Sequence, residues 1–220
     1  MKKKSVAILT FASGSNYGAY LQAFALSNYI KSFGYYVEVI KYDSVMRLLY
    51  EHKDIVTTDF KKLKFNLMKT VAFFGVSKRL FSSGRVFQPI KYLSKFDICV
   101  VGSDVIWDFS NKKLGDLTPN FLLGVNCKKK ISYAASVGSS ADIENFPERF
   151  KTALMDFDKI SVRDEMTKKL INLNDLSAER VLDPTFLIDW NNHISYKVKK
   201  RIQSNYYLVY AYDLTEKEFW

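Results

Sequence analysis

The sequence predicts an α/β protein with a parallel sheet and flanking helices. Short apolar runs of buried-strand type alternate with helical patterns along most of the 220 residues. Several of these runs end in a turn rich in Gly, Ser and Asp, as strand-to-helix connections often do. A strand, a helix and a second strand follow one another near the start, and such a βαβ unit requires parallel pairing. Together these observations predict a Rossmann-like domain.

The first βαβ unit opens with the apolar run 5–11, which is typical of a buried strand. A helix is expected from about Gly18 to Phe33, because apolar residues recur there at helical spacing. A second strand is expected over residues 35–42. This unit therefore places a turn and a helix start beyond the end of the first strand.

The stretch from Thr58 to Lys95 carries another helical pattern. Apolar residues recur at three- and four-residue steps, at Phe60, Leu63, Leu67, Val71 and Phe74. Most of the lysines among them lie off this stripe. We interpret the stretch as a helix packed through the stripe, with a solvated basic face. A helix lying on a membrane surface is the alternative.

Regular alternation then resumes. Strands are expected at 96–101, 130–135, 159–162 and 180–182, and helices at 147–157 and after Glu165. Pro147 is expected in the first turn of its helix, where its missing N–H costs nothing.

The end of the chain predicts a second domain. A new strand is expected over 205–212, followed by a helix start that stops within one turn. We therefore expect a Rossmann-like domain at 1–190, a linker at 191–204 and the start of a truncated second α/β domain at 205–220.

The composition favours anionic partners. Lys and Arg number 33 against 23 Asp and Glu, a net charge of +10, which suits a phosphorylated metabolite, a nucleotide sugar or a lipid surface. Nucleic acid is not expected, because no recognition motif accompanies the basic residues. No apolar run approaches the roughly 18 residues of a transmembrane helix, and the start does not resemble a signal peptide.

Cysteine and histidine are both scarce. Cys99 and Cys127 are too few for a disulfide framework, so we expect a reducing, cytoplasmic environment. Cys99 lies in an apolar strand and is interpreted as a small hydrophobic residue. His52 and His193 lie far apart in the sequence, so no metal site is expected.

Small and polar residues gather at five predicted strand ends. Ligands of open parallel sheets bind beyond the carboxyl ends of the strands, which predicts a ligand cleft here. The alternative, open for each loop, is that strand-to-helix turns use these residue types anyway. The candidate substrate-binding residues at these ends are Gly14, Asn16, Gly18, Gly102, Ser103, Asp104, Ser136, Gly138 and Asp183.

The first of these loops is not expected to bind NAD. Asn16 stands where a dinucleotide motif has its second glycine, and its side chain would obstruct the pyrophosphate. The following helix N-terminus remains open to an anion. Gln22 falls on the apolar face of that helix, and a buried amide needs partners. It either bonds a neighbouring loop backbone, or contacts a ligand or orients a loop.

Two further residues are candidates for ligand contact. Arg163 follows an apolar strand, and its guanidinium can hold a phosphate or carboxylate bidentately. The alternative is a local ion pair with Asp164 or Glu165. Trp107 follows the Gly102-Ser103-Asp104 turn and either packs on a sugar or base or is a core aromatic residue.

The loops taken together resemble the polysaccharide pyruvyl transferase family. The matching segments, which span about residues 5 to 190, are 16–26, 96–104 with Trp107, 132–138, 160–164 and 181–185. Members of this family are similar to GT-B-type glycosyltransferases, with two Rossmann-like domains facing across a cleft. The chain departs from the family at Val105, where Gln is usual.

This resemblance implies transfer of a pyruvyl group from phosphoenolpyruvate to a sugar, with formation of a ketal and phosphate. Acceptors would be sugars of capsules, exopolysaccharides or wall polymers, often on a lipid carrier. The implied location is the cytoplasm, with peripheral contact at the anionic inner face of the plasma membrane. Phosphoenolpyruvate is the donor substrate, and no cofactor is implied.

The resemblance also assigns roles. Arg163 matches the family's arginine of the first domain and is the candidate catalytic donor clamp. A second Arg and a His of the family belong to the second domain, so the 220-residue chain alone is expected to be inactive. Two alternatives stay open, a GT-B-type glycosyltransferase that uses nucleotide sugars and a non-catalytic remnant or binding domain.

Overall fold

The computed structural model describes residues 3–12, 16–40, 42, 60–80, 88–139 and 141–193. The chain divides into two compact units, Met1–Ile188 and Asp189–Trp220. In the second unit, the described part holds one short 3-10 helix, η6 (Trp190–Asn192). The strand and helix start predicted at 205–220 lie outside the described residues, so the division into two domains and a linker stays a prediction.

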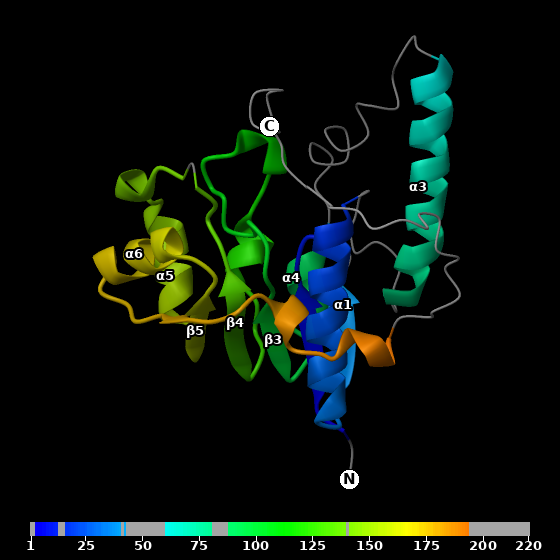
Figure 1. Cartoon of the computed structure of the whole chain (residues 1–220). Coiled ribbons are helices and arrows are strands. Elements are labelled where there is room, and N and C mark those ends of the chain that lie inside the picture. Colours follow the sequence, from blue (N-terminus) through cyan, green and yellow to red (C-terminus); the bar gives the residue numbers. More distant parts are fainter. Residues whose placement is uncertain are drawn as a thin grey trace, which may run out of the picture. The chain divides into compact units, whose positions relative to one another are not determined.

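A six-stranded parallel sheet forms the centre of the first unit (Figure 1). Its spatial order is β2-β1-β3-β4-β5-β6, and every neighbouring pair runs parallel. The predicted α/β class is therefore confirmed. The strands are β1 (Ser5–Leu9), β2 (Tyr36–Ile40), β3 (Ile98–Val101), β4 (Lys129–Ala135), β5 (Lys159–Val162) and β6 (Glu179–Arg180).

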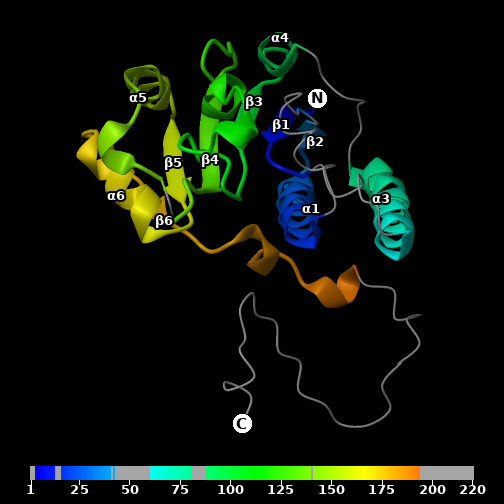
Figure 2. The same ribbon diagram turned by 90° about the horizontal axis from the view of Figure 1, so that it is seen from above.

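Helices cover both faces of this sheet (Figure 2). Helix α1 packs on one face, and α4, α5 and α6 pack on the other. The α-helices are α1 (Tyr17–Ser32), α3 (Phe60–Leu80), α4 (Pro89–Leu93), α5 (Glu148–Met155) and α6 (Glu165–Leu173). The remaining 3-10 helices of this unit are η2 (Lys112–Leu114), η3 (Thr118–Phe121), η4 (Ile143–Asn145) and η5 (Pro184–Phe186).

The central strands read as continuous apolar runs because both faces are buried. In β1, Val6 and Ile8 join the core beneath α1, while Ala7 and Leu9 join the core on the opposite face. This alternation follows from the two-residue period of a strand. The edge strand β6 lacks it, since both of its residues are exposed.

The predicted boundaries hold for β5 and shift elsewhere. The third strand starts at Ile98, two residues later than expected, and β6 covers 179–180 where 180–182 was expected. Pro147 is the residue that caps α5 and does not lie in its first turn, because its backbone is extended (φ −64°, ψ 129°). Despite these shifts, the carboxyl ends of the parallel strands all lie at the same edge of the sheet.

The prediction that α3 packs through its apolar stripe is wrong in its described part. Leu67 and Val71 of the stripe are 46% and 71% exposed. Among the described side chains of this helix, the buried ones are Phe73 and Leu80, which lie on a different face. The Phe73 ring lies 4.6 Å from that of Tyr17 on α1. Packing against α1 thus selects a face that the spacing of apolar residues does not.

Candidate functional site

The carboxyl ends of the parallel strands meet at one edge of the sheet. Because β1, β3, β4 and β5 are consecutive neighbours, the turns that follow them lie in a row. These turns begin at Thr10, Gly102, Ser136 and Arg163. Open α/β sheets bind their ligands along such an edge.

A polar cluster of Ser103, Arg163 and Asp183 lies at this edge. Asp183 Oδ2 accepts a hydrogen bond of 3.2 Å from Ser103 Oγ and lies 3.5 Å from Arg163 Nη1. Ser103 is fully buried, whereas the side chains of Arg163 and Asp183 are 32% and 25% exposed. A buried hydroxyl therefore supports an ion pair that reaches the surface. The structure brings these three predicted site residues together.

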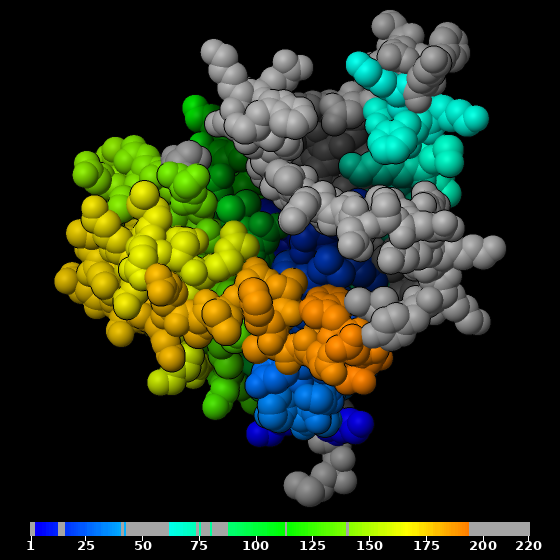
Figure 3. All heavy atoms as spheres, in the orientation of Figure 1, coloured from blue at the N-terminus to red at the C-terminus, as the bar shows by residue number. Residues whose placement is uncertain are grey.

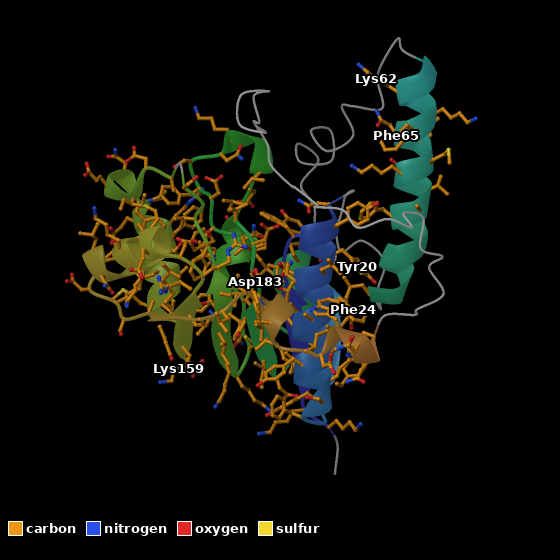
Figure 4. All side chains as sticks on the ribbon, in the orientation of Figure 1. Tyr20, Phe24, Lys62, Phe65, Lys159 and Asp183 are labelled. Atoms are coloured by element: carbon orange, nitrogen blue, oxygen red, sulfur yellow. The ribbon has the colours of Figure 1, made fainter. Side chains whose placement is uncertain are left out.

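Backbone and capping interactions fix both partners of the ion pair. Arg163 donates its backbone N–H to Ala135 O at the end of β4 (3.1 Å). Asp183 Oδ1 accepts hydrogen bonds from the backbone N–H and the hydroxyl of Thr185 (3.0 and 2.8 Å) at the start of η5. That helix packs against α1, and atoms of this stretch, in orange, lie against the blue atoms of α1 in Figure 3. Figure 4 labels Asp183 beside α1.

The local ion pair that was the alternative for Arg163 does not form. Asp164 instead caps α6, accepting from the backbone N–H and hydroxyl of Thr167 (2.8 and 2.7 Å). Glu165 pairs with Arg180 at 2.7 Å. Helix capping and a neighbouring strand thus engage the two acidic residues that follow Arg163 in the sequence.

Gln22 links the first turn of α1 to the strand ends. Its amide Nε2 donates to Thr10 Oγ1 (2.9 Å), Phe11 O (3.3 Å) and Ala19 O (2.8 Å). Thr10 Oγ1 in turn donates to Ser103 O (2.7 Å). Gln22 thus contacts loop backbone, as one alternative held, while its contact with a ligand stays a prediction. Among the described residues, its buried Oε1 atom has no partner.

Gly102 lets the ends of β1 and β3 approach each other. A Cβ atom at this position would lie 2.9 Å from Thr10 Cβ, closer than such atoms come in proteins. The Gly102 N–H donates to Leu9 O at 2.8 Å. The residue is therefore explained by packing, and a contact with substrate stays a prediction.

Asp104, Ser136 and Gly138 form two interlocked turns. Asp104 has a positive φ of 86°, and its carbonyl accepts from the Ser136 N–H (3.1 Å). The Ser136 hydroxyl accepts from the N–H of Gly138 (2.9 Å), whose φ is 79°. These residues hold the β3 and β4 turns together, and their contact with substrate stays a prediction.

Asp108 is a residue at this edge that the sequence does not single out. It is only 8% exposed, and burial raises the pKa of its carboxyl group. Among the described residues its Oδ1 atom has no hydrogen-bond partner. Its Oδ2 atom lies 4.0 Å from where a Cβ of Gly138 would stand. A buried carboxyl group therefore borders the β4 turn. Its position directly after Trp107 in the sequence is the feature that could have indicated its burial.

Trp107 is a core residue, which corrects its assignment as a sugar- or base-binding residue. It is fully buried, and its indole N–H donates to Asn120 O at 2.8 Å. Its ring stacks on Phe121 with 5.4 Å between centroids. Core residues on this face of the sheet surround the ring, and the side chain has no exposed surface with which to bind a ligand.

The first loop is described only in part. Gly14 lies outside the described residues. Asn16 caps α1, since its Oδ1 atom accepts from Ala19 N–H at 3.2 Å. Gly18 is exposed in the first turn, and a Cβ there would lie 3.4 Å from Asn16 Oδ1. Capping explains an Asn at this position, and the role of both residues in substrate binding stays a prediction.

Within the described ranges, no three His, Cys, Asp or Glu side chains come together as metal ligands would. No helix there combines the length and apolar character needed to cross a membrane.

The family model described as polysaccharide pyruvyl transferase matches residues 16–219. The match includes the turns after β3, β4, β5 and β6 and therefore the cluster of Ser103, Arg163 and Asp183. No curated protein matches the chain significantly.

Proposed function

The chain belongs to the polysaccharide pyruvyl transferase family, and on this premise we propose that it serves the transfer of a pyruvyl group from phosphoenolpyruvate to a sugar. The acceptor would be a sugar of a capsule or another cell-surface or exopolysaccharide. The observation that carries the proposal is Arg163, a partly exposed cation at the ligand edge that Asp183 and Ser103 support.

The reaction requires binding of two anionic groups and two proton transfers. Two sugar hydroxyls bond to C2 of the donor, the bond from C2 to the phosphate oxygen breaks, and the two hydroxyl protons go to C3 and to the leaving phosphate. Phosphate leaves and a ketal remains. A guanidinium suits the phosphate or the carboxylate of the donor, because its planar N–H groups match two oxygens at once. We assign this role to Arg163.

Asp183 would keep the guanidinium in place before the donor binds. The ion pair uses Nη1 of Arg163, and among the described residues no second carboxylate pairs with this side chain. The other N–H groups of the guanidinium can therefore bind the donor. Such positioning in advance is what makes a charged group effective in catalysis, since it need not reorganise during the reaction.

The rest of the proposed site would come from a second Rossmann-like domain in a GT-B-like arrangement, supplying another Arg and a His. A net charge of +10 suits a phosphorylated donor and a lipid-linked acceptor at an anionic membrane surface. We place the reaction in the cytoplasm, at the inner face of the plasma membrane.

The test uses a protein that includes the second Rossmann-like domain, with phosphoenolpyruvate and a panel of glycan acceptors. We expect release of inorganic phosphate that depends on the acceptor, and a pyruvate ketal on the product by mass spectrometry. Thermal shifts with phosphoenolpyruvate and with nucleotide sugars are measured in parallel. Stabilisation by nucleotide sugars alone would favour a glycosyltransferase. No stabilisation by either, with no phosphate released, would favour a non-catalytic binding domain.

A further inference from the structure

The two cysteines lie at the amino end of the sheet, which is the end opposite the candidate site. Cys99 is fully buried in β3, and its thiol lies 3.4 Å from Leu93 O. Cys127 lies in the loop before β4 and packs against the core cluster that contains Cys99. In the sheet register Cys99 is opposite Lys130, three residues beyond Cys127. The pairing of β3 with β4 thus places the two cysteines at the same end of the sheet.

Each thiol has a backbone carbonyl within reach, Leu93 O for Cys99 (3.4 Å) and Lys129 O for Cys127 (3.3 Å), and a Cys127 thiolate can accept a hydrogen bond from Cys99. The bond from Cys99, with a contribution from Lys130, lowers the pKa of Cys127 to about 7. The same bond and burial raise the pKa of Cys99 well above its usual range. Cys99 therefore keeps its proton and can donate it to a Cys127 thiolate. When Cys127 is neutral, the Cys99 proton can turn to Leu93 O instead.

Cys127 is the accessible member of the pair. It is partly exposed and lines an open hollow of about 680 Å³, whereas Cys99 has no exposed surface. The charged groups around this hollow are Lys128, Lys130, Asp156 and Asp158. Asp97 holds Lys128 at 2.8 Å, and Asp156 lies 3.4 Å from the ammonium group of Lys130. A small uncharged oxidant can thus reach Cys127 but not Cys99.

We propose that Cys127 is an oxidation site for hydrogen peroxide and that Cys99 resolves the oxidised form to an intramolecular disulfide. Low pKa, access and a resolving neighbour are the features of redox-sensing cysteines. This inference concerns the amino end of the sheet and does not depend on the proposed transferase activity.

The steps balance in atoms and electrons. The Cys127 thiolate attacks one oxygen of hydrogen peroxide, the O–O bond breaks, and the leaving hydroxide takes a proton to become water. Cys127 is then a sulfenic acid. The Cys99 sulfur attacks the Cys127 sulfur, the S–O bond breaks, and the departing hydroxide takes the Cys99 proton. Two thiols thus give two electrons to one peroxide and yield a disulfide and two waters, and an added dithiol reverses the oxidation.

The first test uses the reduced wild-type chain. Native alkylation with iodoacetamide should label Cys127 at least tenfold faster than Cys99, with a half-maximal rate near pH 7. Hydrogen peroxide should remove two hydrogens from the intact mass and give one cross-linked peptide that contains both cysteines. Equal, slow labelling of the two thiols would overturn the proposal, and so would oxidation of Cys127 to a sulfinic acid without a disulfide.

Two variants separate the roles of the thiols, with circular dichroism to verify that each one folds. In Cys99→Ala, peroxide should leave a Cys127 sulfenic acid that dimedone traps, and the alkylation midpoint should rise because the donor to the thiolate is lost. In Cys127→Ser, Cys99 should stay reduced. If Cys99 in that variant oxidises as fast as in the wild type, Cys127 is not the first target and the assignment is wrong.

Discussion

Arg163 pairs with Asp183, twenty positions further along the chain, and not with Asp164 beside it. The separation of 3.5 Å between Arg163 Nη1 and Asp183 Oδ2 depends on two neighbouring strands. The Val181 N–H donates to Val162 O (2.9 Å), which carries the β5–β6 pairing on to the strand ends and brings Asp183 to the edge. The charged group of the candidate site is thus held by tertiary structure.

Replacement of this cation tests the proposed function. In a protein that includes the second domain, we expect Arg163→Lys to lower kcat/KM for phosphate release from phosphoenolpyruvate by about 10²–10³-fold, as removal of one positioned donor to a reacting group does. A lysine keeps the charge but cannot hold two oxygens in a planar fork. The matched control is Arg180→Lys, because Arg180 is an exposed residue that pairs with Glu165. Equal losses in the two variants, or none in either, would contradict the assignment.

The hydrogen bonds through Thr10 are expected to contribute to stability. Thr10→Val would leave the buried Ser103 carbonyl without its hydrogen bond and leave the Gln22 amide with Phe11 O and Ala19 O as its acceptors. We expect a loss of about 1–3 kcal/mol in the free energy of unfolding, measured by urea denaturation. Thr152→Val is the control, because Thr152 is exposed and bonds only its own helix. It should change the free energy by less than about 0.5 kcal/mol. A small effect at both positions would show that the buried chain of bonds is unimportant.

Two glycines are expected to respond in opposite directions to alanine. In Gly102→Ala the new Cβ would lie 2.9 Å from Thr10 Cβ, so the strand ends must separate. A loss of about 1–3 kcal/mol is expected. In Gly75→Ala nothing lies within 4 Å of the new atom. There the better helix propensity of alanine should raise the free energy of unfolding by up to about 1 kcal/mol. Thermal and urea denaturation measure both, and a tolerated Gly102→Ala would refute the close approach.

Asp108 and Asp97 predict opposite pH dependences of stability. Burial raises the pKa of Asp108, so the wild type loses stability as pH rises from the ordinary value of 3.8 through the raised value. Asp108→Asn removes this loss, and its stability relative to the wild type should increase over that window and then level off. Hydrogen bonds from Lys128 and Ser5 lower the pKa of Asp97, which stabilises the fold above pH 3.8.

The measurement is the free energy of unfolding of the wild type and both variants from pH 8 down to the lowest pH at which the wild type still folds. Asp97→Asn should be less stable than the wild type near neutrality, and the difference should shrink as pH falls below 3.8, through the lowered pKa. Parallel curves for the two variants would contradict the environments assigned to these carboxyl groups.

The local pattern predicted most of the sheet and much less of the packing around it. The strand at 159–162 and the helix that starts near Gly18 were predicted to within a residue, because buried parallel strands and amphipathic helices have strong local signals. The stripe on α3 was predicted to be buried and is exposed at Leu67 and Val71. A helical face becomes a core face only when another element covers it, and spacing does not name that element.

The sequence alone determined the α/β class, the family and the row of small and polar residues at the strand ends. Each of these depends on residues close together in the chain. Tertiary structure decided which of those residues meet. It joined Ser103, Arg163 and Asp183, buried Trp107 in the core, and brought Asp108 to Gly138 and Cys99 to Cys127. The physical reason is that strand order and register, which set these long-range contacts, arise from the packing of whole elements and leave no local signal in the sequence.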